Sequence, residues 1–142
     1  MNNNEALLHA WIEMSMSIRG NRLVKELSFN EMVACHYIYY HQKTKGSLIT
    51  ATDLCKKTQL LKSQINQVLT SLEKKDIVRR IRSEEDKRKI YVELNEENAN
   101  LFWQEHQAVM KIVDMVALHL GEEKTAEFTE LMTQVNAMAQ QF

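Results

Sequence analysis

The absence of proline constrains this sequence more than any other feature. None of its 142 residues is proline, and only Gly20, Gly46 and Gly121 are glycine. Proline interrupts helices, and glycine supplies the backbone conformations of many tight turns. A chain without proline and with so few glycines can form long unbroken helices but has few places to turn. The sequence therefore predicts a mainly helical fold.

The length and composition are typical of a globular domain. A chain of 142 residues, 44% hydrophobic and 26% charged, favours one domain or two small ones. No apolar run approaches the ~20 residues of a membrane-spanning helix, and Met1–Glu5 lacks the character of a signal peptide. Cys35 and Cys55 are too few for a disulfide framework or a four-thiolate zinc site. We therefore expect a cytoplasmic protein that contacts no membrane.

The charges are unevenly distributed along the chain. The net charge is −1, yet residues 56–90 contain eleven basic and five acidic side chains. Residues 91–142 contain two basic and nine acidic ones. A basic middle beside an acidic C-terminal third favours a polyanion that docks on the middle segment. A solvated basic surface is the alternative interpretation.

Hydrophobic spacing and capping signals predict the first two helices. Residues 5–19 place apolar side chains near one face at helical spacing. Ser28 and Glu31 have the spacing of a capping box, so a second helix is expected to begin there and to end near Gln42. Residues 43–47 are predicted to form a polar turn.

The middle of the chain predicts two more helices. Residues 48–49 are expected to be briefly extended, and Thr50 with Asp53 predicts the cap of a short helix that ends near Lys57. Residues 63–75 form the next helix. Its buried stripe has the spacing i, i+3, i+4 and i+7 and consists of Ile65, Val68, Leu69 and Leu72.

The pattern then changes to that of a β-hairpin. Residues 77–82 and 89–94 are β-branched runs with partial alternation, and the segment 83–88 between them is wholly polar. We call this predicted hairpin the wing. Asn95, followed by two glutamates, predicts the start of a long helix that ends near Leu120.

The two ends of the chain offer more apolar surface than one small three-helix domain can cover. The helix that ends near Leu120 is apolar over most of its circumference, so we expect it to be buried on most sides. Residues 128–142 carry a further apolar stripe. We therefore predict a dimer interface built from both chain ends. An ordinary intramolecular core is the alternative.

The order of short helix, break, second helix and basic hairpin is that of a winged helix-turn-helix. Such a helix with polar outward residues fits the DNA major groove, which is ~12 Å wide. A helical adaptor that binds protein but no DNA is the rival interpretation, although it leaves the basic hairpin tip unexplained. The sequence contains no glycine-rich phosphate loop, nucleophile elbow or His-Glu-x-x-His motif, so we expect no enzymatic activity and no cofactor.

The chain resembles the multiple antibiotic resistance regulator (MarR) family of bacterial transcription factors. The resemblance is carried by residues 49–65, 72–80, 83–89 and 92–97, and its most specific part is the wing motif Asp86-Lys87-Arg88. It implies a mainly α fold with a small β-hairpin wing. It further implies a winged helix-turn-helix domain at 28–95 and a helical dimerisation domain formed by 1–27 and 96–142. The expected function is that of a homodimeric repressor that binds a pseudo-palindromic operator and is released by a small-molecule ligand.

Three positions depart from the family pattern. Leu61 stands where Ser or Asp usually caps the recognition helix, so Ser63 is the alternative cap and would shift the start of the helix. Asp76 stands where Gly usually ends that helix, and Asp tolerates the left-handed conformation better than most residues. Gln67 stands where Arg is frequent, so base preference does not transfer from relatives.

The candidate DNA-binding residues lie on the recognition helix and the wing. Gln and Asn can bond bidentately to adenine, and Lys can reach guanine or phosphate. Asp86 is expected to position the Arg88 guanidinium. The predicted contacts with double-stranded DNA are Lys62, Ser63, Gln64, Asn66, Gln67, Lys87, Arg88 and Lys89.

The resemblance also implies a pocket for a small aromatic or amphipathic effector. Its candidate lining consists of Trp11, Met14, His36 and Tyr40. The alternative is a redox- or metal-responsive regulator of the same fold. Cys35 is the candidate switch, although a buried inert thiol is the simpler interpretation. Cys35 and nearby histidines have no metal-ligand spacing, so we expect no metal site.

Overall fold

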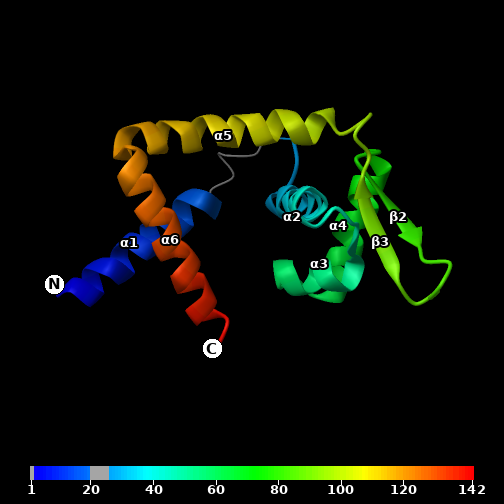
Figure 1. The fold of residues 1–142 in the computed structure, drawn as a ribbon, viewed down its shortest axis with the longest axis horizontal. Coiled ribbons are helices and arrows are strands. Elements are labelled where there is room, and N and C mark those ends of the chain that lie inside the picture. The colour runs from blue at the N-terminus through cyan, green and yellow to red at the C-terminus, as the bar shows by residue number, and fades with distance from the viewer. Residues whose placement is uncertain (1, 20–25) are drawn as a thin grey trace. The chain divides into compact units, whose positions relative to one another are not determined.

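The computed structural model describes residues 2–19 and 26–142 and confirms a mainly helical fold with a small antiparallel sheet (Figure 1). The chain divides into two compact units, residues 1–106 and 107–142. The described elements are α1 (Asn3–Arg19), α2 (Phe29–Lys45), β1 (Ile49–Thr50), α3 (Ala51–Thr58), α4 (Lys62–Lys74), β2 (Val78–Arg82), β3 (Ile90–Leu94), α5 (Asn100–Leu120) and α6 (Glu122–Ala139).

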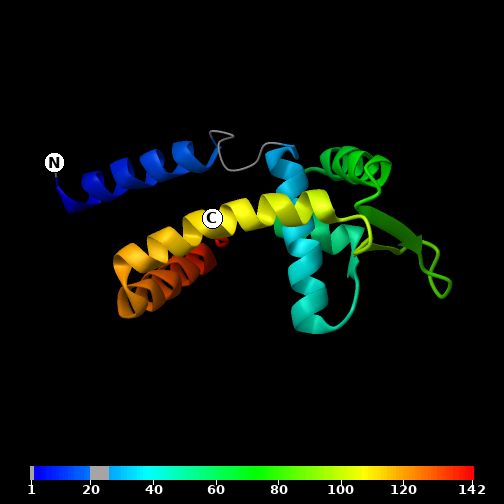
Figure 2. The ribbon, with the colours of Figure 1, turned by 90° about the horizontal axis from the view of Figure 1, so that it is seen from above.

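The sheet consists of the wing hairpin and one short additional strand. Its order is β1-β3-β2, with antiparallel pairs throughout. Ile49 of β1 lies opposite Val92 of β3, and Val78 of β2 lies opposite Leu94. These four side chains are buried, so the face of the sheet that carries them packs on the helices. Figure 2 shows the loop between β2 and β3 extending beyond helices α2, α3 and α4.

The core of the first unit joins α2, α3, α4 and the sheet. The predicted stripe of α4 is buried, and Leu54 of α3 and Ile38 of α2 are fully enclosed. A buried aliphatic side chain of this size contributes about 1.5–3 kcal/mol relative to the exposed state. This apolar core therefore fixes which face of α4 is left in solvent.

The predicted capping box of α2 is confirmed, but the helix is longer than predicted. The Ser28 hydroxyl accepts from the Glu31 amide at 3.1 Å, and the Glu31 carboxylate accepts from the Ser28 amide at 3.0 Å. The helix continues to Lys45, so the expected turn at 43–47 is wrong for its first three residues. Gly46 ends the helix at φ 66°. The first residue that tolerates this conformation, rather than the first polar residue, ends the helix.

The start and the end of α4 resolve two departures from the family pattern. Leu61 occupies the N-cap position, and its amide donates to the Gln64 side-chain oxygen at 2.9 Å. The alternative start at Ser63 is therefore wrong: the helix begins directly after Leu61, and Gln64 supplies the half of a capping box that accepts from the N-cap amide, while the leucine side chain has no acceptor for the amides of the first turn. Asp76 adopts φ 61°, as expected for a residue that replaces glycine after this helix.

The long helix α5 begins at Asn100, so the predicted start at Asn95 is wrong. The Asn95 amide donates to the Ile77 carbonyl at 2.7 Å, and its side chain donates to the Asp76 carbonyl at 3.1 Å. Asn98 adds a bond to the Asp76 carboxylate at 2.6 Å. These long-range bonds occupy the predicted cap residue, and the chain makes a turn before the helix begins.

The second unit contains the last part of α5 and all of α6. Figures 1 and 2 both show α6 leaving the end of α5 through a sharp corner. Gly121 lies there at φ 85°, and the Thr125 hydroxyl donates to its carbonyl at 2.7 Å. Residues 107–142 contain no buried side chain within one chain, so the single chain does not provide the predicted cover for this part of α5. Among the described helices, none has the length and apolar character needed to cross a membrane.

Candidate nucleic-acid interface

Helix α4 presents a polar face to solvent. Ile65, Val68, Leu69 and Leu72 hold its opposite face in the core. The five residues predicted to contact DNA from this helix are all exposed, namely Lys62, Ser63, Gln64, Asn66 and Gln67. The structure therefore brings the predicted helix residues together on one accessible surface.

The side chains of Gln64 and Asn66 differ in whether their polar atoms are free to hydrogen-bond to a ligand. The Gln64 oxygen accepts the capping bond from Leu61. A bidentate adenine contact needs both the oxygen and the amino group of the side chain. Asn66 makes no side-chain hydrogen bond within the described residues, so both of its polar atoms are available. Asn66 is thus the better candidate for base recognition.

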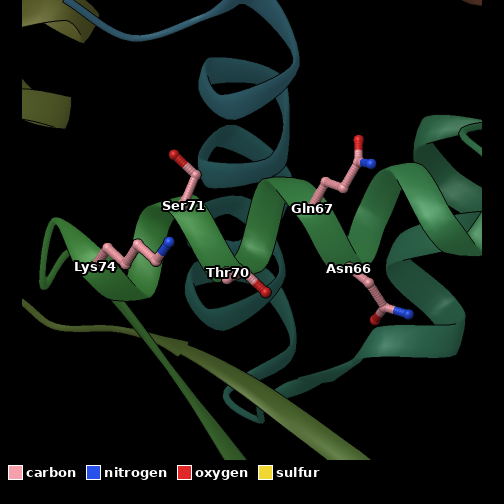
Figure 3. Close-up of a pocket in the computed structure, with 5 residues that line it drawn as sticks. All are labelled: Asn66, Gln67, Thr70, Ser71 and Lys74. Atoms are coloured by element: carbon pink, nitrogen blue, oxygen red, sulfur yellow. The ribbon is translucent and has the colours of Figure 1, made fainter.

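A hollow of about 370 Å³ runs along the same side of α4. It is lined by Asn66, Gln67, Thr70, Ser71 and Lys74. Figure 3 shows these side chains spread along the helix, with α2 behind it. Thr70, Ser71 and Lys74 were missed among the sequence candidates. The available signal was helical spacing, because Thr70 lies four residues after Asn66, Ser71 four residues after Gln67, and Lys74 four residues after Thr70.

The C-terminal end of α4 is fixed by the buried carboxylate of Glu31 on α2. Lys75 Nζ lies 2.8 Å from one Glu31 oxygen, and the Ser71 hydroxyl donates to the same oxygen at 3.0 Å. Burial opposes ionisation of Glu31, but these donors and the Ser28 amide outweigh it and hold its pKa below the ordinary value. A charged Glu31 therefore links the start of α2 to the end of α4.

The wing tip presents basic side chains around one ordered acid. Lys87, Arg88 and Lys89 are exposed. The Asp86 carboxylate accepts from the Arg88 amide at 3.0 Å and from the Arg88 Nε at 3.2 Å. The Arg88 amide, and then its side chain, lower the pKa of Asp86. Asp86 thus lies where a residue that orients Arg88 must lie.

Hydrogen bonds within residues 82–89 fix the backbone of the wing tip. The Lys89 amide donates to the Asp86 carbonyl at 2.9 Å, and the Ser83 amide donates to the Lys89 carbonyl at 2.9 Å. Arg82 Nη1 donates to the Lys87 carbonyl at 2.5 Å. The long polar loop is therefore a hydrogen-bonded structure, which the sequence alone did not indicate.

The predicted effector residues are only partly brought together. His36 and Tyr40 lie on α2, and their rings stack with centroids 6.1 Å apart. Partial burial and the nearby His106 lower the pKa of His36. Trp11 and Met14 are about half exposed on α1, and no ring contact or hydrogen bond of the described residues joins them to the other pair.

An aromatic cluster beside His36 was missed by the sequence analysis. The rings of Tyr39 on α2 and Trp103 on α5 pack edge to face with their centroids 4.9 Å apart. The centroids of Trp103 and Phe102 are also 4.9 Å apart. His106 contacts the rings of Tyr39 and Trp103. Aromatic side chains in two distant segments give no sequence signal for this contact.

Cys35 has the surroundings of an inert thiol. It is completely buried on α2, and burial followed by the negative charge of Glu31 raises its pKa to about 12. The reactive form of cysteine is the thiolate, which these surroundings disfavour. Within residues 2–19 and 26–142, no three His, Cys, Asp or Glu side chains form a group that could hold a metal ion.

The sequence matches the model of a known family. The family model described as transcriptional regulator SarA/Rot matches residues 22–104, which is more than half of the chain. No curated protein matches the sequence.

Several solved structures share the fold. MepR from Staphylococcus aureus in its DNA-binding conformation is 18% identical, with a TM-score of 0.76 over 95% of this chain and 98% of that chain. FabT from Streptococcus pneumoniae in complex with DNA is 21% identical, with a TM-score of 0.65 over 97% and 95%. NadR in complex with 4-hydroxyphenylacetate is 20% identical, with a TM-score of 0.69 over 95% and 92%. These three are MarR-family regulators, so the predicted resemblance in fold is confirmed.

Proposed function

The chain belongs to the SarA/Rot family of transcriptional regulators, and we propose that it acts as a homodimer that binds a pseudo-palindromic operator. Its family and its structural neighbours are winged-helix regulators of transcription and not enzymes. The observation that carries the proposal is the exposed polar face of α4 beside the basic tip of the wing. These two surfaces suit the major groove and the adjacent backbone or minor groove of a duplex.

The proposed DNA contacts are divided between the two elements. The first turns of α4 supply Asn66 and its neighbours Lys62, Ser63, Gln64 and Gln67. The wing supplies Lys87, Arg88 and Lys89, with Asp86 as the residue that orients Arg88. In a symmetric dimer, two copies of this surface bind half-sites about 34–36 Å apart. MepR in its DNA-binding conformation and FabT in complex with DNA support this arrangement by their fold.

The proposed dimerisation domain is formed by residues 1–27 and 96–142. Within this domain, residues 1 and 20–25 lie outside the described residues. Apolar side chains on α1, on the last part of α5 and on α6 are exposed in one chain. Monomeric soluble proteins rarely leave so many large apolar side chains uncovered along a single helix. A second copy of the chain is the partner that such surfaces favour in an oligomeric regulator.

We further propose that the protein is a cytoplasmic repressor and that a small aromatic or amphipathic ligand releases it from the operator. The stacked rings of His36 and Tyr40 offer an aromatic surface for such a ligand, and Trp11 and Met14 are its other proposed contacts. The presence of 4-hydroxyphenylacetate in the similar regulator NadR supports this proposal.

The test compares operator DNA with random duplex. Asn66→Ala is expected to weaken operator binding more than random binding, because a lost bidentate base contact costs ~1–3 kcal/mol. Gln64→Ala should have the smaller effect on discrimination, since its oxygen already caps α4. An equal loss on both DNAs would show that Asn66 does not contact bases. A wild-type chain with no duplex affinity even at low salt would instead be the protein-binding adaptor.

A further inference from the structure

Three arginines at the base of the wing look equivalent in the sequence but have different partners in the structure. Arg79 lies opposite Glu93 across the hairpin, with its Nε 3.3 Å from the Glu93 carboxylate. Arg82 binds the backbone of the tip. Arg80 instead reaches α4. Charge alone would assign all three to phosphate, and the contacts give Arg80 a separate role.

The position of Arg80 on β2 directs its side chain toward α4. Its partner on β3 is the fully buried Val92, and Val78, two residues earlier on the same face, is also buried. The Arg80 side chain is 25% exposed. A guanidinium on the inward face of a sheet needs a compensating partner, because burial of an unpaired charge is costly.

Helix α4 provides that partner with two side chains one turn apart. Arg80 Nε donates to Glu73 Oε1 at 2.6 Å, and its Nη2 lies 2.5 Å from the same oxygen. Nη2 also donates to Thr70 Oγ1 at 2.9 Å. We call Arg80, Glu73 and Thr70 the clasp. The planar, forked guanidinium fixes an angle as well as a distance, which lysine would not.

We infer that Arg80 is a positioning residue for DNA binding, which holds the recognition helix at a fixed orientation to the wing. The inference rests on the proposed function, in which α4 and the wing bind one half-site at the same time. Two linked contacts reinforce each other only when their geometry allows both to form together. Loss of the clasp therefore weakens binding without removal of any DNA contact.

A substitution of Glu73 tests this inference, because two explanations predict opposite changes in operator affinity. Removal of a carboxylate from a DNA-facing helix reduces repulsion from phosphate, so simple electrostatics predicts tighter binding for Glu73→Ala. The clasp predicts the opposite, a loss of roughly 3- to 30-fold in operator affinity, because the lost pair unlocks α4 from the wing. Glu84→Ala is the matched control, since it removes an exposed carboxylate from the wing tip outside the clasp. This control is expected to bind as tightly as the wild type or slightly more tightly.

A double-mutant cycle tests whether Arg80 and Glu73 act as one unit. If they do, Arg80→Ala combined with Glu73→Ala weakens operator binding about as much as either single change. If Arg80 instead contacts phosphate directly, the two single changes have opposite signs and the double variant shows their sum. The melting temperature and the helical signal of each variant show whether it is folded. If Glu73→Ala does not fold, Glu73→Gln is the second variant: it keeps the side-chain shape, removes the charge, and is expected to lose less operator affinity.

The measurement is operator affinity by fluorescence anisotropy at one salt concentration. Weaker binding by folded Glu73→Ala, with an unaffected Glu84→Ala control, supports the clasp. Equal or tighter binding by folded Glu73→Ala, or by Glu73→Gln where Glu73→Ala does not fold, overturns the inference. A wild-type chain that binds no duplex would reject the proposed function and this inference with it. That result is visible before any variant is made.

Discussion

Glu31 has two structural roles that one carboxylate performs at once. One carboxylate oxygen accepts a hydrogen bond from the Ser28 amide and so caps α2. Both oxygens accept hydrogen bonds from Lys75 Nζ at the end of α4. The sequence predicts the first role from local spacing. The second joins residues 44 positions apart and has no local signature. The residue is therefore more important for the fold than its capping motif indicates.

The paired state of Glu31 predicts a dependence of stability on pH. Because its folded pKa lies below the ordinary value of about 4.3, its contribution is complete above that pH. The contribution is lost as the pH falls through the folded pKa. We expect Glu31→Gln to lose about 1.5–3 kcal/mol at neutral pH, which is the range for hydrogen bonds to charged groups.

Urea unfolding of both proteins from pH 7 to pH 3, at fixed protein concentration, measures this contribution. The difference between wild type and Glu31→Gln should shrink toward the acid end of the range. A difference that stays constant over the whole range would show that the charge of Glu31 contributes nothing to stability.

The two cysteines are expected to react differently with thiol reagents. Cys35 is fully buried with its pKa raised to about 12, whereas Cys55 is partly exposed. At pH 8, iodoacetamide should label Cys55 in the folded protein and reach Cys35 only after unfolding. Mass spectrometry of the labelled peptides distinguishes the two sites, and Cys55→Ser is the control. Rapid labelling of Cys35 in the folded protein would restore the oxidation-switch hypothesis.

At the scale of elements, local signals predicted most helices and strands and failed where a distant partner competes. Ser28, Thr50 and Asp76 have the predicted caps or turn because their bonds are formed within a few residues. Asn95 has the same local signal, but its side chain bonds to the carbonyl of Asp76, 19 residues earlier. The start of α5 therefore depends on tertiary contacts that residue spacing does not contain.

The candidate interface shows the same division. The exposed face of α4 follows from its hydrophobic period, because four buried residues determine where the others point. The clasp of Arg80 with Glu73 depends on how the sheet packs on α4. The ordered tip depends on backbone bonds such as that between Ser83 and Lys89. Sequence reasoning thus found the helix surface but missed what holds the helix and the wing in place.

The wing is expected to contribute to DNA binding through Arg88. Its side chain is 92% exposed, so Arg88→Ala should leave the melting temperature and the dimer nearly unchanged. Operator binding should weaken strongly, because an arginine in a narrow minor groove gains from the concentrated negative potential there. If Arg88 neutralises phosphate in both subunits, the salt dependence should flatten by up to about two phosphate equivalents.

Asp86→Ala separates the orientation of Arg88 from simple charge repulsion. Asp86 bonds both the amide and the guanidinium of Arg88, so its loss should weaken binding modestly although a negative charge is removed. Fluorescence anisotropy with operator DNA measures both variants. Tighter binding by Asp86→Ala would show that repulsion outweighs orientation.

At the scale of the whole molecule, the main gap between sequence and structure concerns apolar surface. The sequence predicts that α5 is enclosed on most sides, yet residues 107–142 have no buried side chain in one chain. Leu118 is 86% exposed and Met115 is 70% exposed. The composition predicts that these apolar side chains are buried, but it does not say whether the same chain or a second chain buries them. A second chain provides it in the function we propose.

The stripe on α6 offers the sharpest test of that dimer. Phe128, Leu131, Met132, Val135 and Met138 follow one another at helical spacing and are 42–60% exposed. Burial of a leucine contributes about 1.5–3 kcal/mol, and a symmetric interface contains each position twice. Leu131→Glu should therefore raise the dimer dissociation constant by at least about 100-fold.

Sedimentation velocity at micromolar concentration measures this change against the 16.6 kDa of one chain. Thr133→Glu is the matched control, since it places the same charge on the opposite face of α6 and should leave the dimer intact. Operator affinity should fall with dimerisation in Leu131→Glu, because a monomer binds only one half-site. The unfolding transition of the DNA-binding domain should persist. A wild-type chain that sediments as a stable monomer would contradict the dimer and leave the exposed stripes to a different protein partner.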